Sequence, residues 1–181
     1  MAITSANQLE LLQTAEAVAR EKMIDPDLVI EAISENPEAK RDLYQTVEPR
    51  LKADALLTTN TSSIPLMELR GHIARPAQFA GLHYFNPVAQ MPLVEIIKGE
   101  LTSDETLARG FDYVMQIKKT PIVVNDSRGF FTSRVFGTFT NEGIAMLGEG
   151  VSAAMIENEA RKAGMPVGPL AISDEVSMSL M

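Results

Sequence analysis

Short apolar runs recur along the chain, and their alternation with helical patterns constrains the fold more than any other feature. None of the runs shows the polar–apolar alternation of a strand with one solvated face. Strands that are apolar throughout are typical of sheets covered by helices on both faces. We therefore predict an α/β fold whose strands are DLVIEA (27–32), ALLTT (55–59), QFAGLHYF (78–85), LVEII (93–97) and PIVVN (121–125).

Two of the helices expected between these strands carry start signals. Asn36 precedes Pro37, the order of an N-cap followed by a first helical residue. Thr102 and Glu105 have the spacing of a capping box, which predicts that a helix over 103–118 begins there.

Helical patterning also occupies both ends of the chain. Residues 7–22 carry apolar side chains at the spacing of an amphipathic helix. After Gly129 the pattern is helical only, over about 130–148 and 152–163, with GMPVGP as a break after the second helix. This indicates a second, α-helical unit that follows the sheet.

Composition excludes several kinds of site. The chain has no cysteine and two histidines, so we expect no disulfide, no thiolate chemistry and no metal site. A net charge of −8 opposes broad attraction to nucleic acid or anionic lipid. No apolar run approaches the about 20 residues that span a bilayer, and the first residues lack a signal-peptide pattern. We expect a cytoplasmic protein that binds neither nucleic acid nor membrane.

The run LVEII places Glu95 between apolar neighbours, although a lone buried carboxylate is costly. His83, twelve residues earlier near the end of its strand, is a partner that would remove this cost. A carboxylate-oriented imidazole is a good general base near neutral pH, but such a pair can also merely hold two strands together. Ser62, in the loop NTSS (60–63), could face the same cleft or serve only as a turn residue.

From about residue 27 onward the chain resembles the 3-hydroxyacyl-CoA dehydrogenase family. The matching segments, in family order, are DLVIEAISENPEAK, LLTTNTSSIP, FAGLHYFNPVAQMPLVEII, KTPIVVNDSRGFF and GMPVGPLAISDEV. The resemblance implies a partial Rossmann-like sheet over 27–126, the C-terminal half of an NAD-binding domain. It also implies that 127–181 begin a helical domain for substrate binding and dimerisation, truncated here. The implied reaction is the NAD-dependent oxidation of a (3S)-3-hydroxyacyl-CoA to a 3-ketoacyl-CoA in fatty-acid β-oxidation.

The resemblance also assigns catalytic positions. His83 matches the catalytic base, Glu95 the carboxylate that orients it, and Ser62 a hydroxyl near substrate and nicotinamide. Ser133 stands where the family pattern has an asparagine, so its contact with the substrate carbonyl is expected to be weaker.

Residues expected near the nicotinamide ribose and phosphates match the family as well. The GxGxxG loop that cradles the NAD pyrophosphate is absent from the sequence, so weak or no activity is expected. The matching cofactor positions are Glu35, Lys40, Asn60, Ser62 and Asn86.

The first residues resemble a different protein. The segment MAITSANQLELLQTAEAVAREKMIDPDLVIEA is similar to the N-terminus of the bacterial transcription factor NusA, which implies a chimera whose residues 1–26 have a separate origin. A second hypothesis for function is then a non-catalytic binding or assembly module. Exposed apolar surface on a truncated core favours a homo-oligomer in either case.

Overall fold

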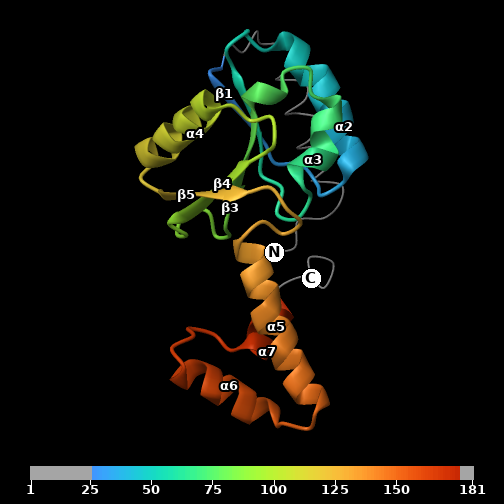
Figure 1. Ribbon diagram of the computed structural model, residues 1–181. Helices are drawn as coiled ribbons and strands as arrows, with labels where there is room; N and C mark the ends of the chain where they lie inside the picture. Colours follow the sequence, from blue (N-terminus) through green and yellow to red (C-terminus); the bar gives the residue numbers. More distant parts are fainter. Residues whose placement is uncertain (1–25, 176–181) are drawn as a thin grey trace, which may run out of the picture.

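Five strands form one sheet in the order β1-β2-β3-β4-β5 (Figure 1). The computed structural model describes residues 26–175. Strands β1, β2 and β3 are parallel, β4 is antiparallel to β3, and β5 is parallel to β4. The predicted α/β class is confirmed, because each strand lies in a predicted run or extends it by one residue. The strands are β1 Leu28–Glu31, β2 Leu56–Thr59, β3 Phe79–Tyr84, β4 Leu93–Lys98 and β5 Thr120–Asn125.

Helices cover both faces of the sheet, with α2 and α3 on one side and α4 on the other (Figure 1). The predicted helix 7–22 lies outside the described residues. The α-helices are α2 Pro37–Val47, α3 Leu66–Leu69, α4 Asp104–Gln116, α5 Thr132–Gly148, α6 Ala153–Lys162 and α7 Pro169–Glu175. Short 3₁₀ turns are formed by Glu48–Arg50, Arg70–His72 and Pro76–Gln78.

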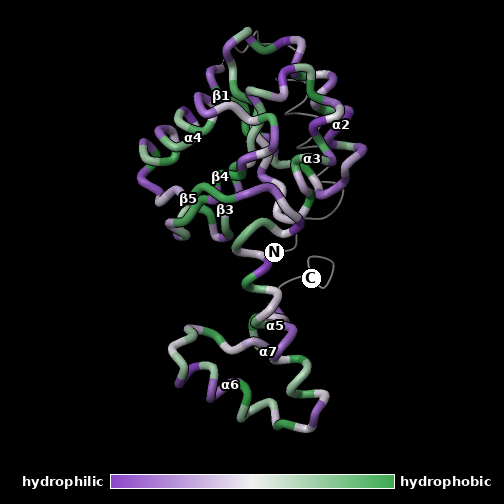
Figure 2. The backbone as a smooth tube through the Cα atoms, in the orientation of Figure 1, coloured by the Kyte–Doolittle hydropathy of each residue, from purple (hydrophilic) through white to green (hydrophobic). Residues whose placement is uncertain are grey.

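Each face of the sheet has its own apolar core. Figure 2 shows hydrophobic segments along β4 and β5 of this sheet. The core under α4 contains Leu82, Val94, Ile96 and Val114. The core under α2 and α3 contains Tyr44, Leu57, Ile64, Leu66, Leu69, Ile73, Phe79, Ile97 and Phe130. Because side chains alternate along a strand, His83 and Glu95 point to the α2–α3 face.

One of the two predicted helix starts is confirmed and one is displaced. Asn36 Oδ1 accepts hydrogen bonds from the backbone N–H groups of Glu38 (2.9 Å) and Ala39 (3.1 Å), as predicted. The capping box at Thr102 was wrong, because α4 is capped by Ser103, whose hydroxyl accepts from Thr106 N–H. The Thr102 hydroxyl instead bridges Gly99 N–H and the Phe79 carbonyl, so it ties the end of β4 to β3.

After β5 the chain leaves the sheet along α5, and α5, α6 and α7 contact one another (Figure 1). Helix α7 was not predicted from the sequence; Glu157 of α6 anchors its start by accepting from Leu170 and Ala171 N–H. Helices α5 and α7 approach so closely that a Cβ on Gly143 would lie 2.5 Å from the Pro169 ring. The domain bounds 1–26, 27–126 and 127–181 remain predictions.

Candidate active site

The carboxyl ends of β1, β2 and β3 lie at one edge of the sheet, since the three strands are parallel. Glu35 follows β1, the loop 60–63 follows β2, and His83 is the penultimate residue of β3. Ligands of open α/β sheets bind at this edge. The fold therefore brings together polar residues that are as much as 48 positions apart between Glu35 and His83.

His83 and Glu95 face each other across the antiparallel pair β3–β4. His83 Nδ1 lies 2.7 Å from Glu95 Oε2, and the two residues are 4% and 0% exposed. A carboxylate can only accept, so the proton of a neutral imidazole is on Nδ1 and Nε2 is the basic nitrogen. Nε2 has no hydrogen-bond partner within residues 26–175. The pairing predicted from spacing is thus present, with one nitrogen left for a further partner.

Glu95 is also held by the first residues of α5. Its Oε1 accepts from the backbone N–H groups of Phe131 (3.2 Å) and Thr132 (2.9 Å), and its Oε2 accepts from the Thr132 hydroxyl (2.7 Å). Burial raises the pKa of Glu95, but the hydrogen bonds from His83 and Thr132 outweigh burial and bring that pKa below its ordinary value. Glu95 is therefore ionised at neutral pH although it is buried.

Ser62 and Ser133 lie next to each other, and Ser133 directly follows Thr132, a donor to Glu95. The Ser133 hydroxyl donates to the Ser62 carbonyl over 3.4 Å, and both residues are half-buried. The loop is fixed from the other side by Glu35, whose Oε1 accepts from Ser62 N–H at 2.5 Å. The same carboxylate accepts from the Thr61 hydroxyl at 2.9 and 3.0 Å. Glu35 thus holds the NTSS loop and is partly exposed at the edge of the sheet.

Lys40 points into the protein rather than toward a cleft. Its Nζ lies 2.7 Å from Glu31 Oε1 and 3.7 Å from Glu35 Oε2, with its side chain 1% exposed. Glu31 completes its hydrogen bonds with the Tyr44 and Thr59 hydroxyls, each at 2.7 Å. The ammonium expected near the cofactor phosphates therefore belongs to a buried polar cluster that joins β1, α2 and β2.

The two predicted asparagines occupy different environments. Asn60 Oδ1 accepts from Tyr84 N–H at 2.8 Å, so it links the ends of β2 and β3. Asn86 is exposed and begins the turn to β4. Of the predicted cofactor residues, Asn60 alone lines a hollow of about 370 Å³, together with Ile30, Ala32, Tyr84, Val88, Tyr113, Ile117 and Lys119.

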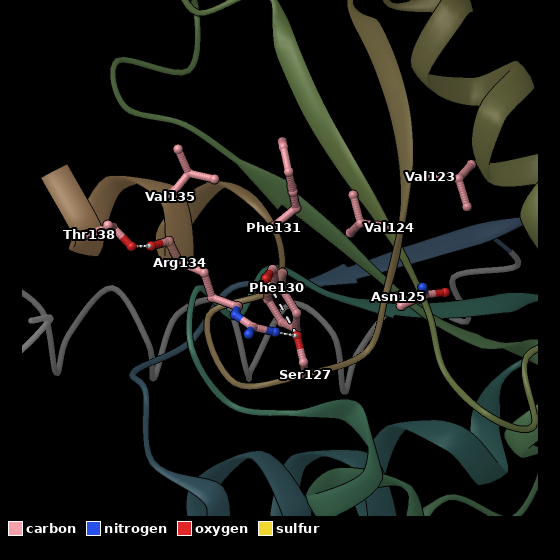
Figure 3. A pocket seen from close by; sticks show the side chains of 9 residues that line it. All are labelled: Val123, Val124, Asn125, Ser127, Phe130, Phe131, Arg134, Val135 and Thr138. Atoms are coloured by element: carbon pink, nitrogen blue, oxygen red, sulfur yellow. Dashed lines mark hydrogen bonds between the residues drawn. The ribbon is translucent and has the colours of Figure 1, made fainter.

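A second cavity, of about 500 Å³, lies between β5 and the first turns of α5 (Figure 3). Its lining includes Phe130 and Arg134 but neither His83 nor Glu95. Phe130 connects this cavity to the His83–Glu95 pair, because it lines the cavity and its ring centroid is 6.0 Å from that of His83. The cavity thus adjoins the His83–Glu95 pair without containing it.

Two groups at this edge, half-buried Thr132 and buried Glu31, were missed by the sequence reasoning. Thr132 supplies two of the donors to Glu95, and Glu31 organises the cluster around Lys40. Glu31 could have been suspected, since DLVIEA buries a carboxylate as LVEII does. Thr132 offered no local signal, because its partner is 37 residues away.

Among residues 26–175, no α-helix combines the length and the hydropathy that a membrane span requires. Within 26–175, no three His, Asp or Glu side chains are grouped so that they could hold a metal ion.

Comparison with known proteins identifies the lineage of this arrangement. A model of the NAD-binding domain of 3-hydroxyacyl-CoA dehydrogenase matches residues 2–127, and a model of the C-terminal domain of the same enzymes matches residues 129–181. The chain belongs to the 3-hydroxyacyl-CoA dehydrogenase family. The match beginning at residue 2 includes the segment expected to be NusA-like, and nothing in the comparisons supports a NusA chimera.

Individual relatives agree with this assignment. The chain is 44% identical, over 155 residues, to the fatty acid oxidation complex subunit alpha of Idiomarina loihiensis; the match covers 85% of this chain and 22% of the relative. The crystal structure of (S)-3-hydroxybutyryl-CoA dehydrogenase from Ralstonia eutropha matches at 32% identity with a TM-score of 0.81, covering 96% of this chain and 62% of that one. The crystal structure of 3-hydroxybutyryl-CoA dehydrogenase from Escherichia coli matches at 29% identity with a TM-score of 0.81. This match covers 96% of this chain and 43% of that one. The chain spans less than two thirds of each.

The NAD of this family has a partial fit to the residues of this chain. A hollow lined by Asn60 lies at the carboxyl ends of the strands, but its side chains Ile30, Tyr84 and Tyr113 pack on the α4 core, on the face opposite to His83. The pyrophosphate half has no GxGxxG loop in this sequence. Polar residues that match the reacting end of the cofactor are therefore present, whereas the glycine-rich loop for its phosphates is not.

Proposed function

We propose that this member of the family retains the chemistry of a 3-hydroxyacyl-CoA dehydrogenase. The proposed reaction oxidises a (3S)-3-hydroxyacyl-CoA to the 3-ketoacyl-CoA with NAD as the hydride acceptor. The observation that carries the proposal is the buried His83–Glu95 pair at the carboxyl ends of the strands, with His83 Nε2 left available. The relatives named above, which act in fatty-acid oxidation or on hydroxybutyryl-CoA by their names, support this substrate class.

In this mechanism His83 Nε2 takes the proton of the 3-hydroxyl group as hydride leaves C3. The imidazole then carries a positive charge, and the Glu95 carboxylate 2.7 Å from Nδ1 stabilises it. Glu95 keeps its own charge throughout, because its pKa is lowered and four donors surround it. In the reverse direction the imidazolium returns the proton to the 3-keto oxygen.

The serines beside the pair are proposed to face the substrate. Ser62 supplies a hydroxyl, and Ser133, adjacent to it, supplies the contact to the substrate carbonyl. A serine has a shorter reach than the family's asparagine, so we propose that this contact is weak or made through water. Glu35 and Asn60 hold the loops around the nicotinamide ribose, with Asn86 at the entrance. NAD, when bound, supplies the carbon that accepts the hydride.

We expect turnover to be slow in this chain. Each charge-assisted hydrogen bond that a pyrophosphate loop would provide contributes about 1–3 kcal/mol, and a tenfold change in affinity corresponds to about 1.4 kcal/mol. NAD affinity therefore falls by orders of magnitude without such a loop. A homo-oligomer in the cytoplasm remains our expectation for its assembly and location.

The test is NADH oxidation with acetoacetyl-CoA, at high NADH concentration, for the parent and for His83→Gln. We expect the substitution to lower kcat/KM by at least about 100-fold, because general-base catalysis contributes about 10²–10⁴. His72→Gln, which alters the other histidine of the chain, is the matched control and is expected to retain parental turnover. A parent without turnover, or turnover unchanged in His83→Gln, would refute the proposal.

A further inference from the structure

Two donors share a single oxygen of Glu95. His83 Nδ1 and the Thr132 hydroxyl each lie 2.7 Å from Oε2, whereas Oε1 is occupied by the backbone N–H groups of Phe131 and Thr132. The carboxylate is ionised and can only accept, so the threonine hydroxyl donates. The Glu95 oxygen that would stabilise a protonated His83 therefore also accepts a hydrogen bond from the neutral Thr132 hydroxyl.

We propose that Thr132 is a positioning residue whose hydroxyl weakens the hydrogen bond between Glu95 Oε2 and the Nδ1 proton of His83. The imidazolium form of His83 is then stabilised less, so that His83 can donate a proton as well as accept one. This role presupposes the function proposed above for His83. A hydrogen bond to the oxygen that faces the imidazole withdraws electron density from that oxygen, so the imidazolium form gains less from the pair. The hydroxyl thus tunes the basicity of the pair without touching substrate.

Orientation and charge can be separated here, because different atoms of Thr132 supply them. The backbone N–H groups of Phe131 and Thr132 bind Oε1 and fix the plane of the carboxylate. They remain when the hydroxyl is removed. Loss of the hydroxyl is therefore expected to change the charge on Oε2 and leave its direction unchanged.

Few other groups face the pair. Within residues 26–175, the His83 ring has a hydrogen bond to the Glu95 carboxylate from β4 and ring contacts with Phe85 (4.5 Å) and Phe130 (6.0 Å), and no second charged group is bonded to it. Glu95 is faced by His83 and by the neutral donors at the start of α5. The charged partner of His83 among these residues is therefore Glu95.

The experiment is an NMR titration of the His83 ring in a His72→Gln background, where a single histidine remains in the chain. Thr132→Val removes the hydroxyl and keeps the shape of the side chain; Thr132→Ser keeps the hydroxyl. We expect Thr132→Val to raise the midpoint of the His83 titration by about 0.5 pH unit, a threefold change in proton affinity. Thr132→Ser is expected to stay within about 0.2 unit of the parent.

Thr132→Ala also removes the hydroxyl and is measured in case Thr132→Val does not fold. It must shift the His83 midpoint in the same direction as expected for Thr132→Val. A midpoint in Thr132→Val equal to that in Thr132→Ser would overturn the proposal. A midpoint that falls would overturn it too, since it would mean that the hydroxyl orients the carboxylate. The titration requires no turnover, so it gives its answer even if the parent fails the NADH assay.

Discussion

Glu31 and Glu95 are two of the three glutamates buried among residues 26–175, and the carboxylate of each has four donors. Glu31 accepts from Lys40, Tyr44, Thr59 and the backbone of Ile33. Glu95 accepts from His83, Phe131 and both donors of Thr132. In both cases hydrogen bonds and a basic partner offset the cost of removing a charge from water.

The difference lies in the basic partner. Lys40 Nζ is enclosed, with Glu31, the Ile33 carbonyl and Glu35 within 3.7 Å. His83 uses one nitrogen for Glu95 and leaves the other without a partner among the described residues. A buried acid beside a fully occupied base is a structural element, whereas one beside a base with a spare nitrogen can take part in proton transfer. Substitutions in the two clusters test this difference, and His83→Gln, with its loss of at least about 100-fold in kcat/KM, has the largest expected effect.

The largest effect on stability is expected from Lys40→Met, which leaves Glu31 charged and buried without its cation. Breaking a buried pair in this way costs about 3–5 kcal/mol. We expect the free energy of unfolding, measured by urea denaturation, to fall by that amount. Lys162→Met, which breaks an exposed pair with Glu159, is the control and should cost less than about 1 kcal/mol. Equal losses in the two variants would refute a structural role for the Glu31 cluster.

A smaller and pH-dependent effect is expected from Glu95→Gln. The pKa of Glu95 is lowered in the folded state, so its charge stabilises the fold above the unfolded value of about 4.3, and this contribution is lost as pH falls through the folded pKa. The variant lacks that contribution at every pH. We therefore expect the stability difference between parent and variant to be constant near neutral pH and to narrow below about pH 4. A difference that is independent of pH would contradict the lowered pKa.

The smallest effect is expected from Tyr44→Phe. Burial raises the pKa of Tyr44, and the nearby Glu31 carboxylate raises it further, so the hydroxyl stays protonated and donates to Glu31. The variant loses this donor but keeps the edge-to-face contact with Phe79 at 5.6 Å. We expect a loss of about 1–2 kcal/mol in urea denaturation, with the His83 titration unchanged. A shifted His83 midpoint would show that the two acid clusters are coupled.

Local signals predicted much of the fold. The strands were visible as apolar runs, and Asn36 and Pro37 placed the start of α2 correctly because an N-cap acts within one turn. The start of α4 was one residue off, since Thr102 and Ser103 both carry hydroxyls and only the tertiary contact of Thr102 with Phe79 distinguishes them. The short helix α7 depends on Glu157, which a local pattern does not reveal.

The candidate site was predictable where chemistry itself demanded a partner. A carboxylate inside LVEII needs a donor, and His83 was near enough in sequence to be found. Lys40 was matched to the cofactor by resemblance, and its inward direction depends on Glu31, a neighbour that the sequence reasoning did not consider. Thr132 reaches Glu95 only because α5 begins beside β4, an arrangement that no periodicity encodes.

Helix α5, which begins at Thr132, also leads from the sheet to the remaining described helices, α6 and α7. It is 17 residues long, about 25 Å at the usual rise per residue, and α6 and α7 pack on it. At its start, the backbone N–H groups of Phe131 and Thr132 donate hydrogen bonds to the carboxylate of Glu95. Because α6 and α7 pack on α5, the helical part of the described chain is joined to the acid behind His83 through the first residue of this helix.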